Sequence, residues 1–333
     1  MRKYNVAIVG CRGAVGCEMY KILLERNFPI NNLHFLSTSA TEEFKDDNGN
    51  LIEVLTQENA SEKFKGIEIG LFSPGAEVSK AMVPHAVKNG CVVIDNTSAF
   101  RMDPDVPLVV PEVNPEDIKS NKGIIANPNC STIQMLVALK PLHDYAKIKR
   151  IVVSSYQAVS GAGGPAIREF EAQQKGDMSV NAFQYQIVRN LIPQIDVALD
   201  NLYTKEEMKM INETKKIMHD DNIRITATCV RVPVLQAHSE SVNIETEKKI
   251  TRAKALELLS KAPGIVIIDD LANNKYPLPL DIEGKDDTYV GRIREDESID
   301  NGLNLWIVAD NLRKGAALNA VQIAEELIKD GLN

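Results

Sequence analysis

One cysteine of this chain stands where a thiol is expected to be reactive. Residues 127–132 read Asn-Pro-Asn-Cys-Ser-Thr, and Cys130 lies between a buried-looking run at 123–126 and an apolar-periodic stretch that begins at Ile133. This pattern predicts a helix N-terminus at the cysteine, where unpaired backbone N–H groups and the helix dipole favour negative charge. Both favour the thiolate, which is the nucleophilic form. Cys130 is therefore the first candidate for a covalent nucleophile.

A glycine-rich turn near the N-terminus is the second feature with chemical meaning. Gly10, Gly13 and Gly16 follow a short β-rich run and open a helical pattern, as in a dinucleotide-binding loop. Glycines there permit a tight turn and a close approach of the backbone to a pyrophosphate at the helix N-terminus. The spacing is G-x-x-G-x-x-G rather than G-x-G-x-x-G, and a purely structural turn is the alternative interpretation.

The end of the second expected strand bears on the choice between NAD and NADP. An NAD site usually places a carboxylate there to bind the ribose 2′-hydroxyl. This chain has Ser37, Thr38 and Ser39 instead, whose hydroxyls can donate to a 2′-phosphate, and Arg12 can add positive charge. We therefore predict NADP, although two glutamates follow at 42–43.

Polar side chains also stand at expected strand ends in three other segments. Gln157 precedes a glycine cluster at 160–164, which either leaves the backbone open to a ligand or forms a plain turn. Arg101 stands at a strand end, where α/β sheets place ligands, and it suits an oxyanion, although most arginines are simply solvated. Arg231 and His238 are separated by a proline-containing loop, and their spacing leaves open whether they converge. A lone histidine is more often structural, but a cysteine nucleophile needs a partner that titrates near neutrality.

The elements that must position these residues fall into two groups. Short β-rich runs at 6–9, 34–36, 67–72 and 92–94 alternate with helical spacing at 15–24 and 78–87, which predicts βαβ units and a largely parallel sheet. After Cys130 the strands lengthen, at 150–159, 223–234 and 241–245, with a helix at 205–218. The fold class predicted is α/β: an N-terminal Rossmann-type dinucleotide-binding domain and an α+β domain with a mixed sheet. We expect the first to comprise 1–129 with 312–333, including an amphipathic helix at 317–329, and the second 130–311.

Composition excludes several classes of protein. A chain of 333 residues favours two domains, and its net charge of −8 argues against nucleic acid as the main partner. The five cysteines are scattered without a C-x-x-C pair, which favours a reducing cytoplasm and offers no zinc-ligand spacing. No apolar run approaches the ~18 residues of a membrane span, and the N-terminus enters a strand without a signal-peptide pattern. We expect a soluble cytoplasmic protein without a metal site.

Together these motifs resemble the aspartate-β-semialdehyde dehydrogenase family. The resemblance runs almost end to end, and several ordered motifs are far more specific than any one of them. They are Gly10–Gly16, Arg101, Asn-Pro-Asn-Cys130-Ser-Thr, Gln157-Ala-Val-Ser-Gly-Ala-Gly, Arg231…His238-Ser-Glu, Val109–Asn114, Glu206–Lys209 and Asp310–Ala317.

The resemblance implies a reversible NADPH-dependent reductive dephosphorylation of L-aspartyl-4-phosphate to L-aspartate-4-semialdehyde. Such a step serves the biosynthesis of lysine (through diaminopimelate), methionine, threonine and isoleucine. Cys130 would form a thioester, His238 would be the general acid/base, and Gln157 would orient the substrate beside the sulfur. A homodimer or homotetramer is also implied.

Substrate and cofactor contacts follow from the same resemblance. Arg231 would bind the α-carboxylate and Glu206 the ammonium group, while Arg101 and Lys209 would hold the phosphate and Asn129 would contact the substrate beside the cysteine. The cofactor contacts implied are Gly10, Cys11, Arg12, Gly13, Ala14, Val15, Gly16, Ser37, Thr38, Ser39, Ser160, Gly161 and Asn311.

Other enzyme classes and a regulator stay open as alternatives. An N-acetyl-γ-glutamyl-phosphate reductase shares the fold and the cysteine chemistry, but Glu206 suits a free ammonium rather than an acetylated amine. Glyceraldehyde-3-phosphate dehydrogenase differs in its glycine turn and cysteine motif. A non-catalytic NADP-binding regulator would not need Cys130 with its partners, and a cysteine hydrolase or acyltransferase would not need the nucleotide turn. Bacterial members of the family often carry an arginine after the second strand, which this chain lacks, so we expect the 2′-phosphate either to be bound less tightly or to depend on Arg12.

Overall fold

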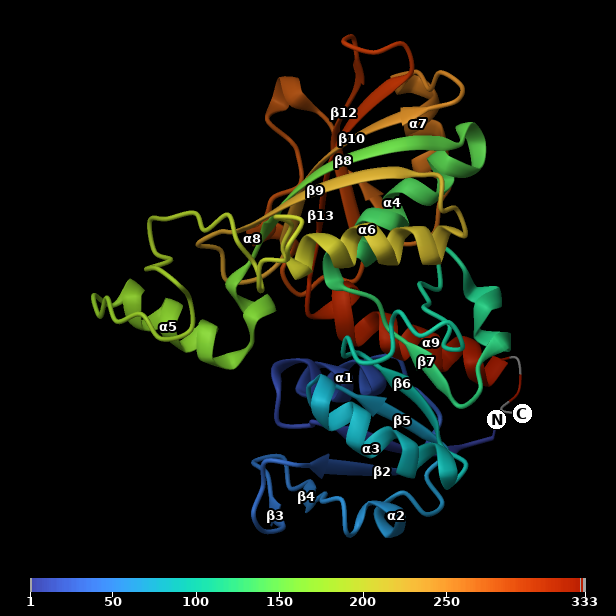
Figure 1. Cartoon of the computed structure of the whole chain (residues 1–333), viewed down its shortest axis with the longest axis vertical. Coiled ribbons are helices and arrows are strands. Elements are labelled where there is room, and N and C mark those ends of the chain that lie inside the picture. The colour runs from blue at the N-terminus through green and yellow to red at the C-terminus, as the bar shows by residue number, and fades with distance from the viewer. Residues whose placement is uncertain (1, 330, 332–333) are drawn as a thin grey trace. The chain divides into compact units, whose positions relative to one another are not determined.

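The computed structural model describes residues 2–329 and 331 of the chain (Figure 1). They form two compact units, the first within Met1–Pro128 and Ala316–Asn333 and the second Asn129–Gly315. The divisions thus fall at 128/129 and 315/316, beside the expected boundaries at 129/130 and 311/312. Residues 1, 330, 332 and 333 of the expected first domain lie outside the described residues.

The first unit is built on a seven-stranded sheet with the order β3-β4-β2-β1-β5-β6-β7. All neighbouring strands are parallel except the edge pair β3–β4. The predicted Rossmann-type sheet is therefore confirmed. The strands are β1 (Tyr4–Val9), β2 (Ile30–Ser37), β3 (Phe44–Lys45), β4 (Leu51–Val54), β5 (Ile69–Phe72), β6 (Val92–Asp95) and β7 (Ile124–Ala126), and the α-helices are α1 (Ala14–Glu25), α2 (Ala60–Lys63), α3 (Ala76–Lys88) and α9 (Leu318–Lys329).

Burial explains why these segments form a doubly wound sheet. The central strand β5 is buried along its whole length, as a parallel strand covered on both faces must be. Helices α1 and α9 pack against each other over a core that includes Ile8, Ile22 and Val321. Strand β1 lies between β2 and β5, so the strand order reverses there, and the glycine turn follows β1 at this switch point. Ligands of open α/β sheets bind at such a point.

The second unit contains the predicted mixed sheet, with the order β11-β12-β13-β10-β8-β9. Its strands are β8 (Ile148–Gln157), β9 (Arg224–Arg231), β10 (His238–Thr246), β11 (Ile265–Ile267), β12 (Thr288–Asp296) and β13 (Gly302–Ala309). The pairs β8–β9 and β11–β12 are parallel, and the others are antiparallel. Helix α4 (Cys130–Ala146) packs against β10, β13, β12 and β8, and α6 (Lys205–Met218) packs against β9 and α4.

The helix expected at 205–218 is present with those bounds. Thr204 and Glu207 form a capping box at its start, and His219 ends it in the left-handed conformation. The strand expected at 150–159 ends instead at Gln157, because Val159 begins a short 3₁₀ helix that leads into α5 (Gly164–Gln174). Strands β3, β4, β11, β12 and β13 and helices α2, α5, α7 (Arg252–Leu259) and α8 (Pro279–Ile282) were not predicted. Among the described residues, none of the helices combines the length and apolar character required to cross a membrane.

Candidate active site

Cys130 is the first residue of α4, as the sequence pattern predicted. Its preceding residue, Asn129, has an extended backbone and caps the helix by accepting a hydrogen bond from the Ser131 N–H at 3.1 Å. The thiol is not part of a disulfide and is partly exposed. A half-exposed sulfur at the first turn of a helix faces the positive end of the helix dipole, which suits a nucleophile.

Helix α6 fixes the residue before the cysteine with two carboxylates. The Asn129 side-chain amide donates to Glu206 at 2.9 Å, and the Asn129 backbone N–H donates to Glu213 at 2.7 Å. All three residues are buried. Both the backbone and the side chain at the entrance of α4 are therefore held by one neighbouring helix.

Glu206 is ionised although it is buried. Burial alone would raise its pKa, but the charge of Lys209 and hydrogen bonds from Lys209, Asn129 and Gln157 outweigh burial and lower the pKa below its usual value. The Lys209 ammonium lies 3.0 Å from Glu206 and 3.1 Å from Asp196, and these partners raise its pKa in spite of burial. The site thus presents a fixed carboxylate next to a fixed ammonium.

Gln157 ends β8 in the same cluster. Its side-chain amide donates to Ser131 at 2.9 Å, to Ser155 at 3.2 Å and to Glu206 at 3.2 Å. These bonds connect the first turn of α4 with the helix that carries Glu206. Gln157 is therefore held in one orientation beside the cysteine's helix.

Arg231 and His238 do converge, which their spacing in the sequence left open. A side-chain carbon added at Gly161 would lie 3.1 Å from the Arg231 guanidinium and 3.1 Å from His238 Nε2. The missing side chain at Gly161 is what allows both to approach the 3₁₀ helix. Arg231 donates to the Ala158 carbonyl at 2.7 Å, and its charge interacts with the Cys130 thiol.

The His238 imidazole is fully buried, and the Ala158 N–H donates to its Nδ1 at 3.0 Å. Burial, followed by the positive charge of Arg231, lowers the pKa of His238 to about 3, and the Glu206 carboxylate opposes this only weakly. His238 is therefore neutral at pH 7.

The side chains of Asn311 and Ser160 are hydrogen-bonded to each other. The Asn311 amide donates to the Ser160 hydroxyl at 3.0 Å and accepts from the Ala237 N–H at 2.9 Å. Both residues are buried. Asn311 thus joins the glycine-rich 3₁₀ segment to the loop that precedes His238.

Arg101 belongs to the first unit, where two backbone carbonyls fix it. Its guanidinium donates to the carbonyl of Asn127 at 2.9 Å and to that of Asn96 at 2.9 Å. Asp95 organises this loop by accepting from the Thr97 backbone and hydroxyl and from Ser79. The arginine is therefore presented in a defined orientation from the carboxyl end of β6.

The glycine turn after β1 has the geometry of a pyrophosphate-binding loop. Gly10 has a φ of +83°, and a side chain there would collide with Ser73 and Pro74 after β5. A side-chain carbon at Gly16 would lie 2.4 Å from the Gly10 carbonyl, so helix and turn pack as closely as glycine permits. No side chain caps the N-terminus of α1 at Gly13, and no acidic residue stands in its first turn. These features fit a nucleotide phosphate.

The residues expected at the 2′-phosphate differ in accessibility. Ser37 is buried, and its hydroxyl accepts from the N–H groups of Ser39 and Ala40, whereas Ser39 is exposed. The Arg12 guanidinium lies 5.4 Å from the ring centroid of Phe44 on β3. Ser37 thus shapes the turn, and Arg12 is held over the aromatic ring of Phe44.

Two residues of the site, Glu213 and Gly315, were not predicted from the sequence. Glu213 lies seven positions after Glu206 on the same helix face, which was a usable signal. Gly315 is close to the nucleophile, because a side-chain carbon there would lie 2.8 Å from Cys130 Cβ. It falls within a motif of the family resemblance, but spacing alone does not connect it to Cys130.

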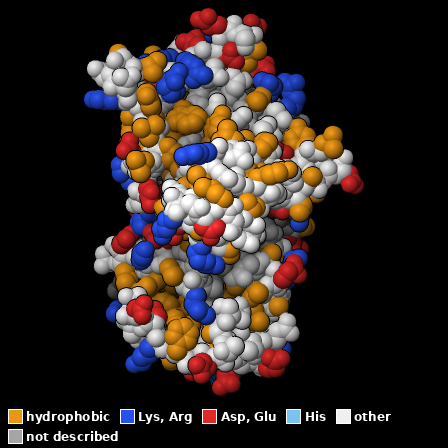
Figure 2. Space-filling view, turned by 90° about the vertical axis from the view of Figure 1, so that its left-hand side faces the viewer, with side chains coloured by type: hydrophobic (Ala, Val, Ile, Leu, Met, Phe, Trp, Pro, Cys, Tyr) orange, Lys and Arg blue, Asp and Glu red, His pale blue; other side chains and the backbone are white. Residues whose placement is uncertain are grey.

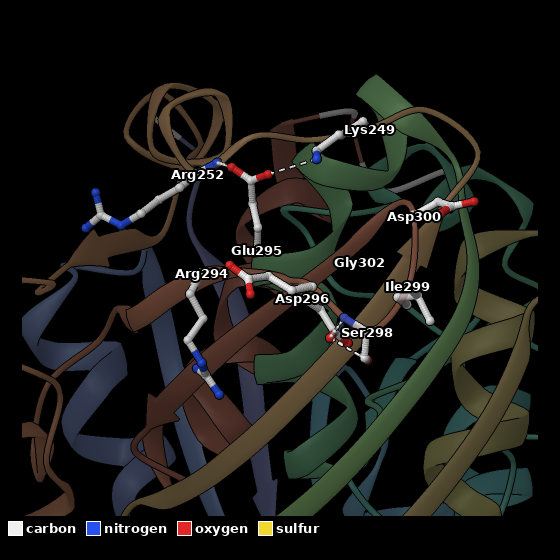
Figure 3. A pocket seen from close by; sticks show the side chains of 10 residues that line it. Lys249, Arg252, Arg294, Glu295, Asp296, Ser298, Ile299, Asp300 and Gly302 are labelled. Atoms are coloured by element: carbon white, nitrogen blue, oxygen red, sulfur yellow. Dashed lines mark hydrogen bonds and ion pairs between the residues drawn. The ribbon is translucent and has the colours of Figure 1, made fainter.

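A pocket of about 670 Å³ lies elsewhere in the second unit, at the tips of β12 and β13 (Figure 3). Two of its three cations form ion pairs, Lys249 with Glu295 at 3.2 Å and Arg252 with Asp269 at 2.9 Å, and the third, Arg294, donates to the Arg292 carbonyl at 2.8 Å. It shares no lining residue with the cluster around Cys130.

Comparisons with known proteins agree across almost the whole chain. The family model described as "Semialdehyde dehydrogenase, NAD binding domain" matches residues 5–121, and "Semialdehyde dehydrogenase, dimerisation domain" matches residues 139–314. Aspartate-semialdehyde dehydrogenase of Aquifex aeolicus (strain VF5) is 55% identical over 99% of both chains, and that of Bacillus subtilis (strain 168) is 49% identical over 98% of both. The crystal structure of aspartate semialdehyde dehydrogenase II from Vibrio cholerae, complexed with ASA, has a TM-score of 0.93 and 47% identity and covers 99% of this chain and 100% of its own.

Proposed function

The chain belongs to the aspartate-semialdehyde dehydrogenase family, and on that basis we propose that it catalyses the reversible, NADPH-dependent reductive dephosphorylation of L-aspartyl-4-phosphate to L-aspartate-4-semialdehyde. The observation that carries the proposal is the position of Cys130 at the start of α4, in the same unit as the buried cluster of Glu206, Arg231, Gln157 and His238. The step would serve the biosynthesis of lysine, methionine, threonine and isoleucine.

Cys130 is the nucleophile in this proposal. Its thiolate attacks the acyl carbon of the aspartyl phosphate, phosphate leaves with the bonding electron pair, and a thioester forms. NADPH, held by the glycine turn Gly10–Gly16, would supply the hydride that reduces the thioester carbonyl. Collapse of the tetrahedral oxyanion then releases the aldehyde and the thiolate. Covalent capture divides a difficult acyl reduction into two easier steps.

The charges of the cluster suit the substrate proposed. Glu206 is an ionised buried carboxylate and would bind the α-ammonium group, and Arg231 would bind the α-carboxylate. Arg101 and Lys209 would bind the phosphate, while Asn129 and Gln157 would orient the acyl group beside the sulfur. His238 would act as the general acid/base for the proton transfers of the reaction.

The carboxylate of Glu206 favours this substrate over an N-acetylated one. An acetylated amine is uncharged and would make no charge-assisted contact with this carboxylate, whereas an ammonium group would.

NADP is the cofactor we propose, bound by Gly10–Gly16 and the segment after β2. A family NAD-binding domain matches this region. The end of β2 carries hydroxyls rather than a carboxylate, and exposed Ser39 with Arg12 would contact the 2′-phosphate. Ser160, Gly161 and Asn311 would contact the cofactor from the second unit.

A homodimer or homotetramer is the assembly we propose. The dimerisation-domain model covers 139–314, and apolar side chains are exposed within 178–202. Figure 2 shows apolar side chains scattered over the face that carries α5. Tyr185, Leu191 and Leu202 are among those exposed. We expect the enzyme to work in the cytoplasm, since its five cysteines are free thiols.

The proposal is tested by a phosphate-dependent assay with aspartate semialdehyde, which compares reduction of NADP with that of NAD. We expect NADP to be reduced only when phosphate or an analogue of it is present. If neither cofactor is reduced while N-acetylglutamate semialdehyde reacts, the substrate assignment is wrong.

A further inference from the structure

Glu240 is a buried carboxyl group that the proposed reaction does not use. It stands on β10 opposite Ser155 of β8 and Ile307 of β13, and its side chain is fully buried. Helix α4, which begins at Cys130, packs against these strands (Figure 1). Gln134, in the second turn of α4, is within hydrogen-bonding reach of the Glu240 carboxyl. The carboxyl group therefore lies between the sheet and the helix that carries the nucleophile.

An ionised Glu240 would leave this layer with acceptors and no donor. Among the described residues, both carboxyl oxygens of Glu240 and Oε1 of Gln134 are buried without a hydrogen-bond partner. The Gln134 amide nitrogen donates to the backbone carbonyl of His238 at 3.4 Å. A buried carboxylate without a donor or a cation is strongly unfavourable. One proton on the carboxyl group removes the charge and supplies the donor that Gln134 Oε1 lacks.

The groups around this layer do not stabilise a negative charge on Glu240. Burial raises the pKa of Glu240 well above its ordinary value, and the hydrogen bond with Gln134 opposes this less strongly. The Arg231 guanidinium does not offset burial, since it stands two residues beyond Cys229, the β9 residue in line with Ser155 and Glu240. The titratable or charged side chains that face this part of the sheet are Cys130 on α4, Glu206, Glu207 and Glu213 on α6, Cys229 and Arg231 on β9, and His238 on β10.

We propose that Glu240 is a positioning residue for Cys130, and that its un-ionised carboxyl group donates a hydrogen bond to Oε1 of Gln134 and so fixes α4 on β10. The first turn of α4 is already bound to β8, because Ser131 accepts from Gln157 at 2.9 Å. The proposed bond secures the second turn to the neighbouring strand. A carboxylic acid kept neutral by its site so that it can donate is a known arrangement in enzymes. The inference rests on the proposed function only for its activity assay.

Proton release on unfolding tests the un-ionised state. A carboxyl group that is neutral in the folded protein and ionised in the unfolded chain releases one proton on unfolding, so its contribution to stability falls as pH rises. Between about pH 5.5 and 7, the unfolding equilibrium constant of wild type relative to that of Glu240→Gln should therefore rise about tenfold per pH unit. A ratio that does not change with pH would overturn the inference.

Glu245, on the same strand, supplies the matched control for the unfolding experiment. A hydrogen bond from Lys149, which lies 3.0 Å away, lowers the pKa of Glu245. Glu245 is therefore ionised in both the folded and the unfolded state over this pH range. The ratio of unfolding constants for wild type and Glu245→Gln should stay constant with pH.

Infrared spectroscopy observes the proton directly. The carbonyl stretch of an un-ionised carboxyl group is well separated from the bands of a carboxylate. We expect it in the difference spectrum between wild type and Glu240→Gln at pH 7, and Gln134→Leu, which removes the acceptor, should shift it to higher frequency. A carboxylate band in its place would show that Glu240 is ionised and would contradict the inference.

Two substitutions test the effect on Cys130. Glu240→Gln keeps a donor for Gln134 Oε1 and should retain most of the wild-type kcat. Glu240→Met has a similar length without a donor and should lower kcat by about 10- to 100-fold with KM for NADP unchanged, because a displacement of about 1 Å near a reacting group can cost 10²-fold. Equal kcat values for the two variants would exclude the positioning role. A wild-type protein inactive in the semialdehyde assay would instead contradict the proposed function, and the unfolding and infrared results do not depend on that assay.

Discussion

The Cys130 thiol is the residue on which the proposed chemistry depends most directly. Cys130→Ser keeps the size of the side chain, but a hydroxyl is far less acidic than a thiol, so we expect turnover to fall on the order of 10⁴-fold or more. NADPH binding, followed by fluorescence titration, should be unchanged. Cys17→Ser, which removes an exposed thiol on α1, is the control and should remain active. Substantial turnover by Cys130→Ser would refute the covalent mechanism.

Glu206 decides between a free and an acetylated amine in the substrate. We expect Glu206→Gln to lower kcat/KM for aspartate semialdehyde by about 10- to 100-fold, because a charge-assisted contact to ammonium is lost. KM for NADP should not change and serves as the internal control. Since the pKa of Glu206 is lowered, the charge that binds ammonium is present at neutral pH and is lost only as pH falls through that lowered value. Unchanged kcat/KM in the variant would contradict this role.

Motifs were sufficient to predict Cys130 at a helix start, because an asparagine cap and an apolar-periodic stretch are local features. The motifs were not sufficient to show that the side chains of Arg231 and His238 lie close together. That contact requires β8 to lie between β9 and β10 and requires the absence of a side chain at Gly161, and neither is a local property. The buried state of Ser37 was not predicted either, although the hydrogen bonds that its hydroxyl accepts from Ser39 and Ala40 are local.

At the scale of elements, helix α6 supports the nucleophile through Glu213. Glu213→Ala would leave the buried Asn129 N–H without its acceptor, and we expect the free energy of unfolding to fall by about 1–3 kcal/mol. Glu213→Gln keeps an acceptor oxygen and should lose less. Glu257→Ala, on the exposed surface of α7, removes only surface ion pairs and should change stability far less than Glu213→Ala. Denaturant unfolding measures all three, and equal losses for Glu213→Ala and Glu257→Ala would exclude the supporting role.

The bounds of α6 could be read from the sequence, because a capping box and one amphipathic face specify them. Other elements could not. Strand β13 is a short apolar run, which periodicity alone does not distinguish from a buried helix segment. The edge strand β3 and its neighbour β4 are short and largely exposed or half-buried. Since Asn311 follows β13, its position relative to Ser160 depended on an element that was not predicted.

For the whole molecule, the two crossings of the chain between the units bear on the site. The chain enters the second unit at Asn129 and leaves it at Gly315. Within that unit Gly315 lies against Cys130, because a side-chain carbon at 315 would be 2.8 Å from Cys130 Cβ. Both chain connections between the units therefore begin next to Cys130, and only glycine fits at position 315.

Assembly is the remaining property at this scale, and a matched pair of leucines tests it. Leu202 and Leu280 are 90% and 84% exposed, but only Leu202 lies in the apolar segment 178–202. An exposed apolar patch that pairs with a second copy cannot accommodate a buried charge at low cost. We therefore expect Leu202→Glu to shift the protein toward monomer in light scattering coupled to gel filtration, whereas Leu280→Glu should leave the wild-type mass unchanged. Dissociation by Leu280→Glu alone would place the interface on α8 instead, and a monomeric wild type would exclude the proposed assembly.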